Sequence, residues 1–288
     1  MNYKTATAFR QALESRLNSQ QLTLPGGVQR LRKAVAFERF MARLQAGADE
    51  RLLLKGGFAL QLRASTHARF TRDLDVSVNL KFFSAAGVTP ATILTCLREG
   101  ARQNLSDFFA FEVGTSTNIP IPDSPNRAFR FPIRALLDGR SFESFHADTG
   151  VGDPLVEKPI SLPPLDLLSF SGLPPVGLKS IAPEQHFAEK LHALTLRRDG
   201  IENTRSHDLI DLMILLDLNL GPAPSVLNAV NSIFRSRGTH AVPHDLDDPP
   251  ASWDARYSAL VGDVRVVQTT VRAAMERLRE YWAGVLRH

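Results

Sequence analysis

The chain has 288 residues, of which 43% are hydrophobic and 22% are charged, a composition that allows a full apolar core and up to two domains. Its single cysteine, Cys96, excludes an intramolecular disulfide and a metal site built on several thiolates. The formal charge of +4 mildly favours a polyanionic partner, and without a signal-like or bilayer-length apolar segment we expect a cytoplasmic protein.

Residues 1–46 carry apolar side chains at near-helical spacing, which predicts helices. Arg32, Arg39 and Arg43 share another side of this segment. We interpret that side as a solvated face, with a nucleic-acid contact as the alternative.

A short strand and a short helix precede a longer amphipathic strand. The apolar run over 51–54 predicts a buried strand, and a helix is expected over 58–63, after a glycine pair. From 71 to 80 polar and apolar residues alternate, with Asp73 and Asp75 on the polar face, as in a half-buried strand. Beyond it we expect a helix over 90–104 and strands over 108–113, 129–136 and 141–148.

Prolines mark the expected boundary between two lobes. From 154 to 183 the sequence is rich in proline and small residues, which oppose regular structure. We therefore place an α/β lobe over 1–155 and a helical lobe over 156–288. Within the second lobe, helices are expected over 184–198, 206–219, 225–237, 253–261 and 263–286.

Two carboxylates and two glycines form the candidate site. Asp73 and Asp75 are two positions apart on a strand, so their side chains point the same way and suit hard divalent cations, Mg²⁺ or Mn²⁺. In Lys55-Gly56-Gly57 no glycine side chain obstructs a triphosphate, and backbone amides at a helix start favour anions. Together these features predict a metal and phosphate site for nucleotidyl transfer from an NTP.

A third carboxylate would complete such a metal site. Asp148 is our candidate because it ends an alternating run that a neighbouring strand would bring beside the first pair. Asp153, in a Gly-Asp-Pro turn, is its rival. Arg69 and Arg72 flank the aspartates in sequence and would neutralise phosphate; the alternative is that they form salt bridges with those same aspartates.

The first helix of the second lobe carries a polar stripe. His186, Lys190 and Arg197 lie along one face of the helix that opens at Pro183, and we expect this face to border the cleft. Lys190 would contact the triphosphate as a point charge, unless it is simply solvated.

The next helix carries two acidic residues one turn apart, Asp208 and Asp211, behind an expected N-cap at Ser206. The adjacent pair His207-Asp208 also occurs in metal phosphohydrolases. That alternative ranks last, because further histidines at ligand spacing are missing.

Four segments, taken together and in this order, carry a resemblance to a known family. They are Leu54–Leu60 (LKGGFAL), Arg69–Val76 (RFTRDLDV), Ala188–Leu194 (AEKLHAL) and Arg205–Leu212 (RSHDLIDL). The chain resembles the AbiEii/AbiGii-type nucleotidyltransferase toxins over about residues 50–220, and residues 1–45 have no counterpart in the resemblance. It implies a polymerase-β-like minimal nucleotidyltransferase core with a mixed sheet and a helical C-terminal lobe.

The resemblance also implies an activity. Mycobacterial-type members add nucleotides to the acceptor end of tRNA and block aminoacylation, and a cognate antitoxin neutralises such a toxin. Asp73 and Asp75 match the metal ligands, Lys190 the nucleotide-phosphate contact, and Asp211 a base or positioning group. Thr71 matches a hydroxyl whose phosphorylation would silence the enzyme through charge repulsion. One departure is that the glycine pair stands where the wider superfamily often has Gly-Ser, so a serine contact to phosphate is absent.

Two further functions remain open from the sequence. A small-molecule nucleotidyltransferase, of the kind that adenylylates aminoglycosides, would use the same glycine pair and carboxylates. A degenerate transferase fold would act only as a binding partner, against which the intact Asp73, Asp75 and Lys190 argue.

Overall fold

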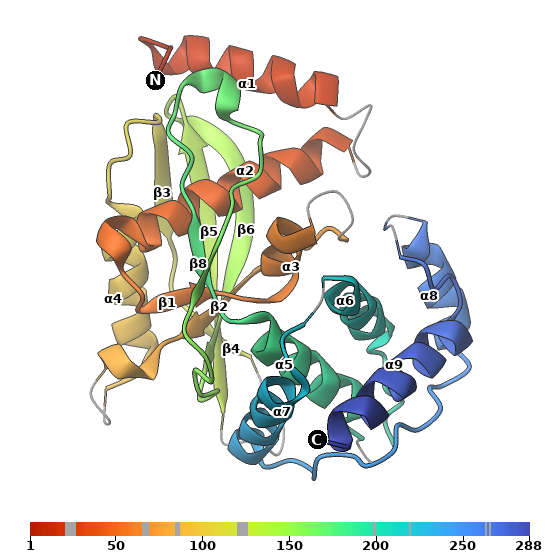
Figure 1. The fold of residues 1–288 in the computed structure, drawn as a ribbon. Helices are drawn as coiled ribbons and strands as arrows, with labels where there is room; N and C mark the ends of the chain where they lie inside the picture. The colour runs from red at the N-terminus through yellow and green to blue at the C-terminus, as the bar shows by residue number, and fades with distance from the viewer. Residues whose placement is uncertain are drawn as a thin grey trace.

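The computed structural model describes residues 1–20, 27–64, 69–83, 87–119, 126–197, 200–218, 220–262, 264 and 266–288. A mixed sheet occupies one side of the molecule and a group of helices the other (Figure 1). Its strand order is β3-β5-β6-β2-β1-β8-β7, and β4 pairs with the N-terminal part of β5, next to the part that pairs with β3. The strands are β1 Leu52–Leu54, β2 Leu74–Val78, β3 Phe109–Val113, β4 Thr117–Ile119, β5 Arg127–Leu137, β6 Arg140–Val151, β7 Ile160–Leu162 and β8 Leu178–Ser180.

Strand β2 lies in the middle of this sheet. It pairs antiparallel with β1 and parallel with β6. Leu74, Val76 and Val78 are buried because the alternation of the sequence directs them into the core. In the β2–β6 register Asp75 lies opposite Asp148, so two residues distant in sequence become cross-strand neighbours.

Helices α1 (Ala6–Gln20), α2 (Gly27–Leu44) and α4 (Pro90–Ala101) pack beside the sheet. Figure 1 shows α2 crossing the strands and α1 lying over α2. The apolar side chains of α2 join those of the strands in one core, which completes the α/β half.

The prediction that the arginines of the N-terminal helices form a solvated face is wrong for two of the three. Arg39 and Arg43 are buried, and both bind the carboxylate of Asp107, Arg39 at 2.7 Å. Arg43 also lies over the ring of Phe111 and donates to the carbonyl of Phe109. The Asp107 carboxylate neutralises its buried charge, so the two arginines connect α2 to the start of β3.

The remaining helices form the second half, with its own apolar core. Leu60 and Ala64 of α3 pack into that core although α3 follows directly from β1, so α3 joins the two halves. These helices are α3 Gly56–Ala64, α5 Pro183–Thr195, α6 Ser206–Asp217, α7 Ala223–Arg237, α8 Trp253–Val261 and α9 Val271–Leu286.

Most of the expected elements are found, with three corrections. The proline-rich segment 154–183 is not irregular throughout, because β7 and β8 join the sheet within it, and β8 runs parallel to β1. Ser206 is not the N-cap of α6, since that position belongs to Arg205. Helix α9 does not start near 263 but at Val271, where the Thr270 hydroxyl accepts from the amide of Ala273.

The fold class is confirmed as α/β, with a mixed sheet and a helical C-terminal part. Sheet residues continue to Ser180, so strands lie on both sides of the boundary expected near 155, and that boundary stays a prediction. In the part of the chain that the structure describes, no helix is long and apolar enough to span a bilayer.

Candidate active site

The glycine pair opens α3, directly after β1, and lies against the Asp75 carboxylate. Gly56 has a φ of +62°, and a Cβ there would lie 2.0 Å from Oδ2 of Asp75. A Cβ at Gly57 would meet the side chain of Thr71 at 2.7 Å. The Gly57 amide donates to the Asp75 carboxylate. The glycines are therefore required here for the approach of Asp75 and Thr71 as well as for backbone conformation.

We expect Gly56→Ala to reduce activity strongly, because the new Cβ displaces Asp75 and the backbone is strained at this φ. The loss should exceed the accompanying loss of stability, which we place at roughly 1–3 kcal/mol. Gly139, also at positive φ but with open space around it, supplies the matched control. Initial rates and denaturant unfolding of both alanine variants test this; equal rate losses in the two would contradict it.

Three aspartates approach one another on the same side of the sheet. Asp148 is opposite Asp75 in the β2–β6 register, as the sequence suggested, and Asp73 precedes β2. Arg130 of β5 donates to Asp148 at 2.8 and 2.6 Å and to Asp73 at 3.3 Å. His146 Nδ1 lies 3.5 Å from Asp73. Among the described residues, no group of three or more His, Cys, Asp or Glu side chains is arranged to hold a metal ion. Arg130 occupies part of the carboxylate oxygens of Asp73 and Asp148.

Asp75 lies in a buried environment that opposes its ionisation. Burial raises the pKa of its carboxyl, and the nearby Asp148 charge raises it further, while Lys190 and Lys55 oppose both effects. The resulting pKa is about 6. An additional cation beside Asp75 and Asp148 would therefore be favourable, which agrees with the oxygen donor set that divalent cations prefer.

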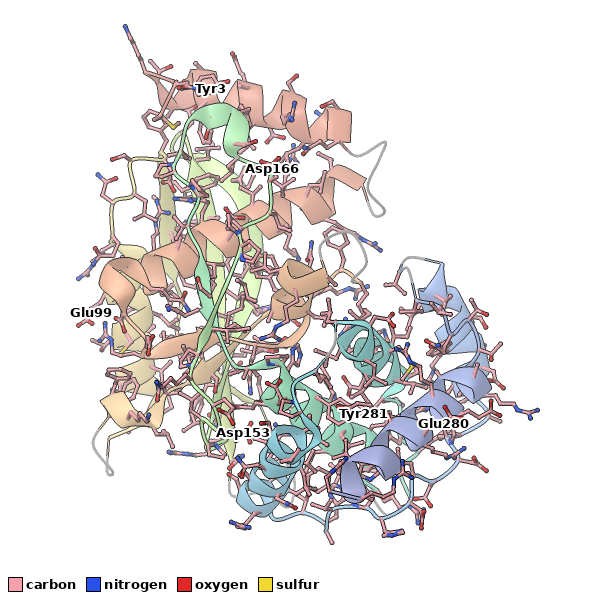
Figure 2. All side chains as sticks on the ribbon, in the orientation of Figure 1. Tyr3, Glu99, Asp153, Asp166, Glu280 and Tyr281 are labelled. Carbon is pink, nitrogen blue, oxygen red and sulfur yellow. The ribbon has the colours of Figure 1, made fainter. Side chains whose placement is uncertain are left out.

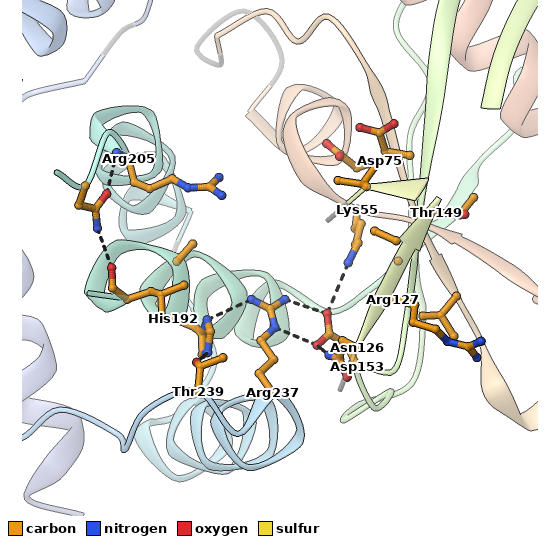
Figure 3. Close-up of a pocket in the computed structure, with 18 of the residues that line it drawn as sticks. Lys55, Asp75, Asn126, Arg127, Thr149, Asp153, His192, Arg205, Arg237 and Thr239 are labelled. Atoms are coloured by element: carbon orange, nitrogen blue, oxygen red, sulfur yellow. Dashed lines mark hydrogen bonds and ion pairs between the residues drawn. The ribbon is translucent and has the colours of Figure 1, made fainter. Parts of the chain in front are cut away.

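Lys55, which is predicted to bind phosphate, is part of an ionic cluster between the two halves. Its Nζ lies 3.2 Å from Glu189 of α5 and 3.5 Å from Asp153. Arg237 of α7 pairs with Asp153 at 2.8 Å and lies 3.6 Å from Glu189. Asp153, the rival third carboxylate, is thus a partner of cations where the sheet meets the helices (Figures 2 and 3).

A second ionic cluster surrounds Asp211 of α6, which is fully buried. Lys190 of α5 lies 2.7 Å from both Asp211 and Asp208. Arg69, from the segment before β2, donates two hydrogen bonds of 2.8 Å to Asp211. The expected alternative for Arg69, pairing with the aspartates of β2, is therefore wrong, because α6 supplies the carboxylate.

Burial and ion pairing oppose each other in this cluster. Burial alone would raise the pKa of Asp211, but Lys190 and Arg69 outweigh it and hold the pKa below its usual range. Burial would likewise lower the pKa of Lys190, but Asp208 and Asp211 outweigh it and raise the pKa. Asp211 is therefore ionised and its oxygens are occupied, which favours a positioning role over that of a base.

The polar stripe expected along α5 does not face the cleft as a unit. His186 is buried against Arg63 at 2.8 Å, and burial lowers its pKa well below the ordinary value, so it is neutral. Arg197 is exposed and pairs with Asp247. His192, on another side of α5, is the histidine that lines the cavity.

A cavity of about 440 Å³ separates the sheet from the helices beside these clusters. Asp75, Asp148 and Thr149 line the sheet side, and residues of α5, α7 and the segment before α6 line the other (Figure 3). Its other lining residues include Lys55, Asn126, Arg127, Asp153, His192, Ile201, Asn203, Arg205, Arg237 and Thr239.

Sequence reasoning missed Arg130, Glu189 and Arg237. Arg130 alternates with buried Phe129 and Phe131, so its direction was readable, but its pairing with Asp148 depends on strand register. Glu189 and Arg237 meet only through the packing of α5 against α7, which no local pattern contains.

The sequence matches the family model described as "Nucleotidyl transferase AbiEii toxin, Type IV TA system" over residues 39–288. The chain belongs to this AbiEii family of nucleotidyltransferase toxins. The resemblance suggested by the four motifs is thereby confirmed. Membership implies an antitoxin partner for this AbiEii-family chain.

A solved structure described as an antigenic nucleotidyltransferase-like protein from Paracoccidioides brasiliensis is also similar to this AbiEii-family chain. It is 14% identical, with a TM-score of 0.41, and the match covers 71% of this chain and 88% of that one. Among curated proteins none matches the sequence.

Proposed function

We propose that the protein transfers a nucleoside monophosphate from an NTP to the 3′ acceptor end of tRNA and so blocks aminoacylation and translation. Membership of the AbiEii family supports the transferase class. The observation that carries the proposal is the pairing of Asp75 with Asp148 in adjacent strands, directly above the Gly56 turn and at the edge of a nucleotide-sized cavity.

Asp73, Asp75 and Asp148 would hold Mg²⁺ or Mn²⁺, and their fit rests on three carboxylates on one sheet face and the incompletely neutralised charge of Asp75. Such an ion supplies charge neutralisation to the phosphates and a more acidic attacking hydroxyl. Arg130 has to yield part of its hold on Asp73 and Asp148 when the ion binds.

The transfer step exchanges a phosphoanhydride bond of the NTP for a phosphodiester bond to the acceptor. The terminal hydroxyl of the acceptor attacks the α-phosphorus, its proton passes to solvent, and the bond to the β-phosphate breaks to release pyrophosphate. Lys190 would contact the departing phosphates as a point charge, held in place by Asp208 and Asp211. The Gly56 amide would replace the missing serine hydroxyl, since the Gly57 amide already donates to Asp75.

Thr71 offers a means of control within this proposal. Its hydroxyl donates to the backbone carbonyl of Asp73, and its side chain lies against Gly57. A phosphate on this hydroxyl would add negative charge beside Asp73 and Asp75 and occupy the space above the turn, so phosphorylation would silence transfer.

The test offers total tRNA and, separately, a mixture of aminoglycosides to the purified protein with Mg²⁺ and each α-labelled NTP. Matched controls are tRNA whose 3′ end has been oxidised with periodate, an arm with EDTA, and γ-labelled NTP. We expect label in intact tRNA from an α-labelled NTP, and none in the three controls. If only the aminoglycosides are labelled, the acceptor is a small molecule and not tRNA. If periodate-oxidised tRNA is still labelled, the nucleotide is not transferred to the 3′ end.

A further inference from the structure

The cations that line the cavity differ in how fully they are neutralised. Lys55 and Arg237 each lie within 3.5 Å of a carboxylate, and Arg127 donates to the carbonyl of Val88 at 2.9 Å. Among the residues that the structure describes, the one carboxylate paired with Arg205 is Asp208, with 3.7 Å between Nη1 and Oδ2, beyond hydrogen-bond distance. Its side chain is 57% exposed and, in Figure 3, extends from the helical side into the space facing Asp75.

Hydrogen bonds fix the backbone that carries the exposed Arg205 side chain. The amide of Arg205 donates to Oδ1 of Asn203 at 2.8 Å, and Nδ2 of Asn203 donates to the carbonyl of Leu194 at 2.8 Å. The indole of Trp253 donates to the carbonyl of Asn203 at 2.6 Å. A guanidinium that is held only by a long ion pair, on an anchored backbone, is preorganised for a ligand, because little ordering is needed when the ligand arrives.

Helix stability does not explain an arginine at this position. Arg205 is the N-cap residue of α6 and makes no capping hydrogen bond. A cation beside the positive end of a helix dipole is unfavourable, and Ser, Asp or Asn are the residues that stabilise an N-cap. Asp208 is already paired with Lys190 at 2.7 Å, so its charge does not require Arg205.

Arg205 is also close to the proposed reaction centre. Asp208, which lies 3.7 Å from Arg205, also binds Lys190. Lys190 is in turn the cation that most lowers the pKa of Asp75. Arg205, Asp75 and Asp148 line the same cavity. A guanidinium in this position matches the paired oxygens of a phosphate group, which it binds through two parallel hydrogen bonds.

We infer that Arg205 binds the phosphates of the incoming nucleotide from the helical side of the cavity. This inference rests on the proposed function, and it assigns to α6 a specific contact with the triphosphate. Loss of a hydrogen bond to a charged group weakens binding by roughly ten- to a hundredfold. The same chemistry exists in the backbone of the RNA acceptor, so the experiment has to separate the two sources of phosphate.

The test compares Arg205→Gln and Arg205→Lys with Arg197→Gln, which removes an exposed arginine paired with Asp247 outside the cavity. Equilibrium dialysis with an α,β-methylene NTP gives the Kd without turnover, and steady-state rates give KM for NTP and for tRNA separately. We expect Arg205→Gln to raise Kd and KM for NTP roughly ten- to a hundredfold. Arg205→Lys should recover part of the loss, and KM for tRNA and melting temperature should stay unchanged.

Two results would overturn the assignment while leaving the proposed function intact. An unchanged Kd for NTP with a raised KM for tRNA would place the contact on the acceptor backbone. Unchanged values for both would make Arg205 a solvated side chain. If the wild-type protein itself binds no nucleotide, the proposed function fails together with the inference.

Discussion

Asp75→Asn is expected to lower the rate of nucleotide transfer by roughly a thousandfold or more, equivalent to about 4 kcal/mol of transition-state stabilisation. Asparagine keeps the size of the side chain and so avoids the collision that a larger residue would make with Gly56. What it removes is the negative charge beside Asp148 that a divalent cation requires. Single-turnover rates at saturating NTP and Mg²⁺ measure this loss, and a variant that retains a tenth of the wild-type rate would remove Asp75 from the metal site.

Although Asp75→Asn should abolish most of the activity, we expect it to stabilise the fold at alkaline pH. Because the folded-state pKa of Asp75 is about 6, above its ordinary value of 3.8, the contribution of this group to stability is fully present below pH 3.8 and is lost as pH rises through 6. In metal-free buffer at pH 8, Asp75→Asn should therefore melt at a higher temperature than the wild type, and the difference should vanish toward pH 4. Thermal unfolding across this range measures the difference; a variant less stable at pH 8 would contradict it.

Asp211→Ala is expected to destabilise the protein by roughly 3–5 kcal/mol, because it leaves the Lys190 and Arg69 cations buried without their shared counter-ion. Asp211→Asn should cost less, since the amide oxygen still accepts a hydrogen bond. Denaturant unfolding measures both changes.

Asp247→Asn is the matched control for this substitution, because Asp247 and its partner Arg197 are both exposed. Its pair should contribute at most about 1 kcal/mol. A change of that size for Asp211→Ala would mean that the cluster around Asp211 adds little to the stability of the fold.

The elements of this fold were largely predictable from local pattern, because alternation and helical spacing are properties of short segments. The run with Asp73 and Asp75 predicted β2, and its carboxylates pointed to a metal site before the family was considered. Strands β7 and β8 were not predicted, since three-residue strands between prolines carry almost no periodicity.

The candidate site was predictable in its residue types and less so in its pairings. Lys55, Arg69 and Lys190 were predicted to contact phosphate, which stays a prediction. Their partners Glu189, Asp211 and Asp208 depend on how α5 and α6 pack against the sheet. Tertiary contacts of this kind leave no trace at fixed sequence spacing. Arg130 was missed for the same reason.

The cations deepest between sheet and helices already hold counter-ions from the opposite half of the molecule. Lys55 of the sheet side holds Glu189, Arg237 of the helical side holds Asp153, and Arg69 holds Asp211. When a triphosphate binds any of these cations, the ion pair between that cation and a carboxylate of the other half has to break. Nucleotide binding that recruits one of these cations is therefore thermodynamically coupled to the ion pairs that join the two halves of the molecule.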